Sequence, residues 1–159
     1  LIDFAQVTSL DLTIDGADEA DRKLNLIKGG GGALLREKIV ASLSRRVVII
    51  VDSHKQVDRL GAFPLPVEVV RFAWQPIAQR LAEMGGTPTL RIGADGQPMR
   101  TDENNYILDC AFGTIHDPAE LACRLNAVPG VMEHGLFVGM ADTLIVGQDD
   151  GVAVFEKEC

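Results

Sequence analysis

The chain has 159 residues, of which 47% are hydrophobic and 24% charged, and its formal net charge is −8. This length suits one domain or two small ones, the acidic balance argues against a nucleic-acid partner, and no apolar run is long enough to cross a membrane. Cys110, Cys123 and Cys159 form no spaced pair, so we expect no disulfide framework and no zinc site, and the cytoplasm is the default location.

The first third of the chain predicts a strand, a helix and a second strand. Apolar and polar residues alternate over 10–15, which is the period of a strand that ends at Asp15. The pattern is helical over 33–46, and the unbroken apolar run 47–51 suits a strand buried on both faces of a parallel sheet. A sheet of this βαβ type binds ligands at the carboxyl ends of its strands, here Asp15 and the polar loop 52–55.

A second unit follows the Gly- and Pro-rich stretch at 61–66, where we expect a domain boundary. Its patterns predict the order βαββαβ, which is the ferredoxin-like split motif. The expected elements are a strand at 67–70, a helix from Trp74 to Gly85, strands at 87–92 and 106–110, a helix capped by Asp117 and a strand at 131–138.

The last part of the chain predicts a β-hairpin, with strands at 143–146 and 152–155 around a polar turn. We expect the hairpin to pack on the first unit. The predicted fold class is therefore α/β, with a parallel-sheet domain of residues 1–62 and 139–159 and an inserted α+β domain of residues 63–138.

Glu37 is the most informative charged residue of the first predicted helix. A general base for carbon-acid chemistry is well served by a carboxylate in apolar surroundings. The alternative is a glutamate at the helix edge that meets a lysine or arginine from elsewhere. No cation lies three or four positions away on the helix, where the neighbours are Ala33, Leu34, Val40 and Ala41.

Lys28 precedes four consecutive glycines, Gly29, Gly30, Gly31 and Gly32, just before this helix. Glycine N–H groups at a helix start can approach an oxyanion or a phosphate, and the lysine adds a full positive charge. The spacing is that of neither a P-loop nor a G-x-G-x-x-G motif, so a nucleotide is not indicated. A flexible turn is the alternative.

The segment Asp15-Gly16-Ala17-Asp18 follows the first predicted strand. Its carboxylates could hold a ligand there, or they could form a turn and cap a helix. A metal is not expected, because no histidine lies near in sequence and the spacing is not that of an EF-hand. Lys55, after the second predicted strand, could reach a phosphate or could be solvated.

Taken together, these motifs resemble the ribose-5-phosphate isomerases of the A type. The resemblance covers nearly the whole chain in order, and the ordered set is highly specific although each segment alone is modest. The matching segments are 15–19, 28–31, 36–38, 52–58, 63–68, 107–109, 129–131 and 135–137.

The resemblance implies an aldose–ketose isomerase that interconverts ribose 5-phosphate and ribulose 5-phosphate through an enediolate, without metal or cofactor. It implies that Glu37 carries a proton between C1 and C2, while Lys28 and the adjacent glycine amides stabilise charge on oxygen. It assigns Asp15 and Asp18 to sugar hydroxyls and ring opening, and Lys55 to substrate contact. It also implies a Rossmann-like domain, a small ferredoxin-like domain, and assembly as homodimers or larger homo-oligomers.

Family members begin with a segment that carries a Thr/Ser-Gly phosphate loop, which this sequence does not show. We therefore expect a Rossmann-like domain that is incomplete at its N-terminus, and little activity from this chain alone. One alternative is the sugar-phosphate-sensing domain of a DeoR-like regulator, which needs a pocket but no base. Another is a structural partner with a degenerate site, which the intact motifs disfavour.

Overall fold

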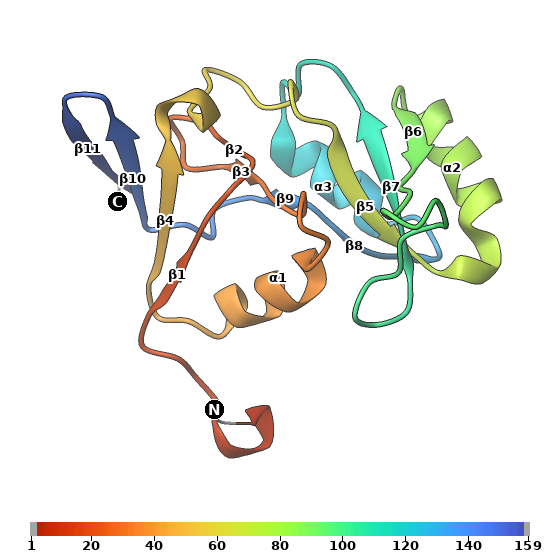
Figure 1. Cartoon of the computed structure of the whole chain (residues 1–159), viewed down its shortest axis with the longest axis horizontal. Helices are drawn as coiled ribbons and strands as arrows, with labels where there is room; N and C mark the ends of the chain where they lie inside the picture. Colours follow the sequence, from red (N-terminus) through yellow and green to blue (C-terminus); the bar gives the residue numbers. More distant parts are fainter. Residues whose placement is uncertain (1–2, 158–159) are drawn as a thin grey trace.

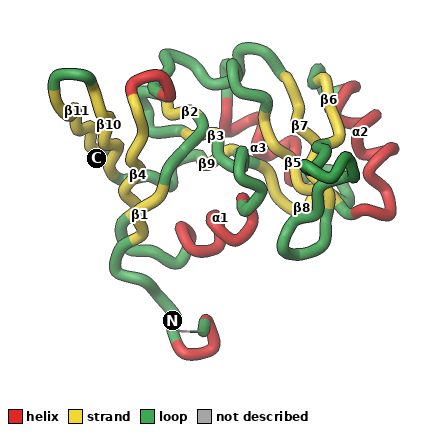
Figure 2. The backbone as a smooth tube through the Cα atoms, in the orientation of Figure 1, coloured by secondary structure: helices red, strands yellow, loops and turns green. Residues whose placement is uncertain are grey.

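The computed structural model describes residues 3–157, which form an α/β structure with three sheets. A four-stranded sheet lies at each end of the molecule, and a three-stranded sheet lies between them (Figure 1). Long loops connect these layers (Figure 2). No helix within residues 3–157 has the length and apolar character that a membrane crossing requires.

The first four-stranded sheet has the order β1-β4-β10-β11, and its first three strands run parallel. The C-terminal hairpin of β10 and β11 joins this sheet next to β4, as predicted. The connecting helix α1 ends four residues earlier than the pattern suggested. The elements are β1 (Thr13–Asp15), α1 (Leu34–Ser42), β4 (Val47–Asp52), β10 (Thr143–Gln148) and β11 (Gly151–Glu156).

Only one face of this sheet is buried. Val47, Ile49 and Val51 of β4 pack into one cluster with Ala41 of α1, whereas Ile50 of the same strand is 49% exposed. The expectation that 47–51 is buried on both faces is therefore wrong for the described residues. The reason is that α1 and the central sheet cover a single face, so the other face of β4 meets solvent.

The second four-stranded sheet has the order β6-β7-β5-β8, with all neighbouring strands antiparallel. Together with two helices it follows the predicted βαββαβ order. The elements are β5 (Leu65–Val69), α2 (Trp74–Glu83), β6 (Thr87–Leu90), β7 (Tyr106–Ala111), α3 (Pro118–Asn126) and β8 (Val131–His134).

The two faces of this second sheet have different neighbours. One face packs against α2 and α3, with Val67, Leu108, Ile77, Leu81, Leu121 and Leu125 in one apolar cluster. The other face contacts residues 29–32, which we call the glycine segment. A Cβ at Gly29 would lie 3.2 Å from Pro66, and one at Gly32 would lie 3.6 Å from Ile107. The second sheet therefore supports the glycine segment directly.

A three-stranded antiparallel sheet, which the sequence patterns did not predict, joins the two units. It consists of β2 (Glu19–Ala20), β3 (Leu26–Ile27) and β9 (Leu136–Phe137) in the order β2-β3-β9. Within β3, Leu26 packs in the core of the first sheet and Ile27 in the core of the second. The predicted strand 131–138 is divided accordingly between β8 and β9.

The domain boundaries after residues 62 and 138 stay a prediction: the two four-stranded sheets each lie within one predicted unit, whereas β9 of the second unit pairs with β3 of the first. Glu19, only 4% exposed, holds the chain near the first boundary. Its carboxylate accepts hydrogen bonds from the N–H groups of Gly61, at 2.7 Å, and Phe63, at 2.6 Å.

Candidate active site

Lys28 occupies the centre of the candidate site. Its backbone N–H donates to the Gly135 carbonyl at 2.9 Å, which fixes the chain at the end of β3. The side chain is 5% exposed, and its ammonium lies 2.9 Å from Asp15 Oδ2 and 3.2 Å from Glu37 Oε2. The ammonium also donates to the Gly16 carbonyl at 2.5 Å. A buried ammonium thus joins two carboxylates that the sequence analysis had placed on separate elements.

Glu37 lies in the first turn of α1, and its side chain is 28% exposed. Its Oε2 is buried and has no hydrogen-bond partner among the described residues, although Lys28 is close. The helix neighbours of Glu37 supply no cation, but Lys28 does, so the carboxylate does not lie in purely apolar surroundings. Lys28 directly follows β3 and lies outside the helix, so helical spacing could not reveal it. The alternative of a lysine from elsewhere describes the contact, and that lysine is itself a predicted site residue.

A second lysine, Lys38, whose side chain is 14% exposed, lies over the same Phe137 ring as Lys28. The Phe137 ring centroid lies 5.5 Å from the Lys28 ammonium and 4.9 Å from that of Lys38, within the range of cation–π attraction. Lys38 pairs with Glu133 at 2.5 Å and donates to the His134 carbonyl at 2.6 Å. Burial lowers the pKa of Lys38. Burial, with help from Lys38, lowers the pKa of His134 to about 4.

Asp18 holds the glycine segment in place. Its backbone N–H donates to the Ile27 carbonyl at 2.8 Å, and its Oδ2 accepts from the Gly30 N–H at 2.7 Å. A Cβ at Gly30 would lie 2.6 Å from Asp18 Oδ1, so this approach requires glycine. The turn-forming alternative therefore holds in part for Asp18, because its carboxylate organises the loop.

The structure brings all of the predicted site residues to one cleft of about 180 Å³. Lys55 reaches it from a short 3-10 helix, Ser53–Lys55, that follows β4. The roles of these residues stay predictions, whereas their proximity is established. The lining residues are Asp15, Gly16, Ala17, Asp18, Lys28, Gly29, Gly30, Gly31, Glu37 and Lys55.

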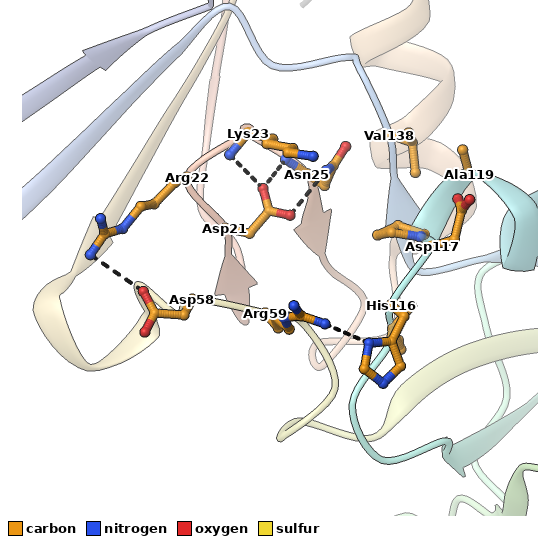
Figure 3. A pocket seen from close by; sticks show the side chains of 12 residues that line it. Asp21, Arg22, Lys23, Asn25, Asp58, Arg59, His116, Asp117, Ala119 and Val138 are labelled. Atoms are coloured by element: carbon orange, nitrogen blue, oxygen red, sulfur yellow. Dashed lines mark hydrogen bonds and ion pairs between the residues drawn. The ribbon is translucent and has the colours of Figure 1, made fainter.

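A larger hollow of about 590 Å³ lies between the β2–β3 turn and the start of α3 (Figure 3). Arg22 pairs there with Asp58 at 3.3 Å, and Arg59 contacts His116. Asp21 accepts from backbone and side-chain groups of its own turn. The hollow is lined by none of the predicted site residues, and its three carboxylates, those of Asp21, Asp58 and Asp117, are engaged locally. The residues that line the two hollows therefore indicate the smaller cleft as the candidate active site, although its volume is smaller.

Two supporting residues escaped the sequence analysis of the site. Arg91 donates to the Gly29 and Gly30 carbonyls, and Asp109 binds Arg91. The available signal was a charged residue within or beside an apolar strand pattern, which did not indicate a partner. Within residues 3–157, no group of three or more histidine, cysteine or acidic side chains is arranged to hold a metal ion.

Comparison with known proteins adds sequence relatives. The family model described as Ribose 5-phosphate isomerase A (phosphoriboisomerase A) matches residues 1–151. The ribose-5-phosphate isomerase A of Chloroflexus aurantiacus is 58% identical over 148 residues, which are 92% of this chain and 62% of that protein. That of Thermomicrobium roseum is 54% identical over 153 residues, which are 95% of this chain and 65% of that protein. The chain thus spans less than two thirds of these relatives' length.

A solved structure is similar throughout. A D-ribose-5-phosphate isomerase in complex with phospho-erythronic acid superimposes with a TM-score of 0.94 at 41% sequence identity. The match covers 98% of this chain and 69% of that one. The fold class expected from the sequence is therefore confirmed, and a DeoR-like sensor domain is not favoured.

Proposed function

The chain belongs to the ribose 5-phosphate isomerase A family, and we propose that the full-length protein interconverts ribose 5-phosphate and ribulose 5-phosphate. The observation that carries this proposal is the contact between Glu37 and the buried Lys28 ammonium inside the predicted cleft. A carboxylate beside a buried positive charge supports this proposal, because an enediolate mechanism needs a proton acceptor and a charge that stabilises the oxyanion.

Glu37 is the base in this proposal. On the open-chain aldose it removes the proton from C2, and the electron pair of that C–H bond forms the C1–C2 double bond while the C1 oxygen becomes negative. Glu37 then delivers the proton to C1, and the O2 hydroxyl proton passes to O1, which leaves a carbonyl at C2. The aldose and the ketose have the same composition and the same overall oxidation state, so this isomerisation needs no redox cofactor.

Lys28 stabilises the negative charge that passes from Glu37 to the substrate oxygen during the reaction. Its ammonium, which carries three N–H donors, lies beside Asp15, the Gly16 carbonyl and Glu37. When Glu37 takes the substrate proton, its negative charge disappears as a negative charge develops on the substrate oxygen. Lys28, which then no longer faces a charged Glu37, can donate an N–H to that oxygen. The ion pair therefore holds the stabilising charge ready before the reaction starts.

The remaining cleft residues bind the sugar. Asp15 and Asp18 accept hydroxyl hydrogens and assist ring opening, the glycine amides donate to the reacting oxygens, and Lys55 contacts the substrate. Asp15 and Lys55 end or follow neighbouring parallel strands, where ligands of open α/β sheets bind. The protein acts in the cytoplasm as a homodimer or larger homo-oligomer, which family membership supports.

The test compares the full-length gene product with its Glu37→Gln variant. Wild type should convert ribose 5-phosphate, and the variant should lose at least about 10²-fold in kcat, since it lacks the base. Binding of phospho-erythronic acid should persist in the variant. Glu83→Gln is the matched control, because Glu83 is exposed and contacts only Arg80 among the described residues. Wild-type turnover by Glu37→Gln would refute the proposal.

A further inference from the structure

Arg91 lies between the second sheet and the glycine segment of the cleft. It follows β6, and its Nε and Nη2 bind the two carboxylate oxygens of Asp109 on β7, at 2.9 and 2.5 Å. Its Nη1 donates to the Gly29 carbonyl at 2.8 Å and to the Gly30 carbonyl at 3.1 Å. Four of the five guanidinium N–H donors are thereby used.

These contacts determine where the neighbouring N–H groups point. In a planar trans peptide the carbonyl and the N–H point in opposite directions, so each carbonyl bound to Arg91 turns an N–H away from it. The peptide that begins with the Gly29 carbonyl ends with the Gly30 N–H, which donates to Asp18 at 2.7 Å. Asp18 and Arg91 therefore grip this peptide from opposite sides.

The next peptide, between Gly30 and Gly31, has the same orientation, but its N–H donates to no group within residues 3–157. The Gly30 carbonyl faces Arg91, so the Gly31 N–H points to the side of the segment away from Arg91. Within residues 3–157 this N–H donates no hydrogen bond, and Gly31 lines the cleft. An oriented N–H without a partner, in the cleft that holds Glu37, is suited to a substrate oxygen.

The Arg91–Asp109 pair is rigid enough for this task. The two side chains are 12% and 27% exposed, and the paired, two-bond geometry leaves the guanidinium little freedom to rotate. A lysine could not replace this arrangement, because its ammonium lacks the planar fork that reaches a carboxylate and two carbonyls together. The second sheet thus holds a backbone donor of the first unit through a single side chain.

We propose that Arg91 is a positioning residue which, through the Gly29 and Gly30 carbonyls, orients the Gly31 N–H toward the oxygen that becomes negative during isomerisation. The inference rests on the proposed function. Asp109 has the related task of holding Arg91 in place. The βαββαβ unit therefore contributes to catalysis although none of its side chains reaches the reacting atoms.

The experiment measures kcat, KM and binding of phospho-erythronic acid in the full-length protein. Arg91→Lys and Arg91→Ala should lower kcat about 10- to 100-fold, because a misdirected donor stabilises the transition state poorly. KM should change less than about threefold, since Glu37 and Lys28 remain. Asp109→Asn, a milder change that keeps the side-chain volume, should lower kcat in the same direction. Arg80→Ala, at an exposed position of α2, is the control.

Each outcome decides a separate question. If wild type isomerises ribose 5-phosphate and the folded Arg91 and Asp109 variants keep kcat within twofold, the positioning role is wrong. A purely structural role would lower thermal stability and leave kcat of the folded fraction unchanged, which would also overturn the inference. If wild type binds phospho-erythronic acid but does not isomerise the sugar, the proposed function fails and the inference fails with it.

Discussion

The Lys28 ammonium lies 3.2 Å from Glu37 Oε2, although Lys28 follows β3 and Glu37 lies on α1. The lysine is almost fully buried, and Oε2 is buried as well. An ion pair shielded from water is costly to break by removal of one partner. In the proposed mechanism the pair therefore links the stability of the cleft to its chemistry, because the same ammonium that pairs with Glu37 also stabilises the developing oxyanion.

Replacing Lys28 should impair turnover more than binding. Lys28→Met keeps most of the side-chain volume but removes the charge, so we expect kcat to fall about 10²-fold or more. Kinetics with ribose 5-phosphate in the full-length protein measure this. Lys23→Met, at an exposed position in the β2–β3 turn, is the control. A Lys28→Met enzyme with kcat within threefold of wild type would show that the ammonium does not stabilise the transition state.

Gly135 should be essential for stability, because its backbone joins the two units. It donates to the Pro66 carbonyl at 2.7 Å and accepts from Lys28, and an added Cβ would lie 2.1 Å from the Lys28 carbonyl oxygen. Gly135→Ala must move backbone, so we expect a loss of about 3 kcal/mol or more in the free energy of unfolding. Chemical denaturation measures it.

The matched control for that substitution is Gly147→Ala. Gly147 also lies in a strand, and its added Cβ would approach nothing closer than the Val51 carbonyl oxygen, at an ordinary 3.8 Å. Its free energy of unfolding should change by less than about 1 kcal/mol. Equal losses in the two variants would show that the contact with Lys28 is not what makes Gly135 necessary.

His134 should make stability depend on pH. Burial and the Lys38 ammonium lower its pKa from 6.5 to about 4, whereas Glu133, 4.0 Å from Nε2, acts in the opposite direction. The unfolded chain therefore binds the proton more readily. This contribution is complete above pH 6.5 and is lost as the pH falls toward 4, by about 3 kcal/mol in all.

Denaturation of wild type and His134→Gln between pH 8 and pH 4 tests this contribution. The glutamine cannot titrate and can still accept the Leu136 N–H that His134 Nδ1 accepts at 3.3 Å. As the pH falls below 6.5, the free energy of unfolding of wild type should decrease more than that of His134→Gln. A difference that stays constant over this range would mean that His134 is not held neutral by the fold.

Periodicity predicted the long elements of the fold well. The alternation before Asp15, the apolar run of β4 and the βαββαβ order all depend on local pattern, which the sequence displays. The central sheet could not be predicted, because β2, β3 and β9 are two residues long and show no period. β3 pairs with β9, which is far away in sequence, and the backbone hydrogen bond from Lys28 to Gly135 lies beside this pair.

The site was predictable as a set of residues but not as a network of contacts. Motifs near the strand ends and the glycine segment identified the residues that line the cleft. Helical spacing relates only residues of the same helix as Glu37, so it could not indicate Lys28, which follows β3. Arg91 was invisible for a similar reason, since its partners at the glycine segment lie about 60 residues earlier in the chain. Lys28 meets Glu37, and Arg91 meets the glycine segment, only through the tertiary fold, which local sequence patterns do not display.

The most direct test of the account follows the substrate proton itself. The full-length protein and its Glu37→Gln variant are each incubated with ribose 5-phosphate in deuterium oxide, and NMR follows deuterium at C1 of ribulose 5-phosphate and C2 of ribose 5-phosphate. We predict deuterium at these carbons with wild type and none above background with Glu37→Gln, while both proteins bind phospho-erythronic acid. Exchange by Glu37→Gln at the wild-type rate would contradict the assignment of Glu37 as the base.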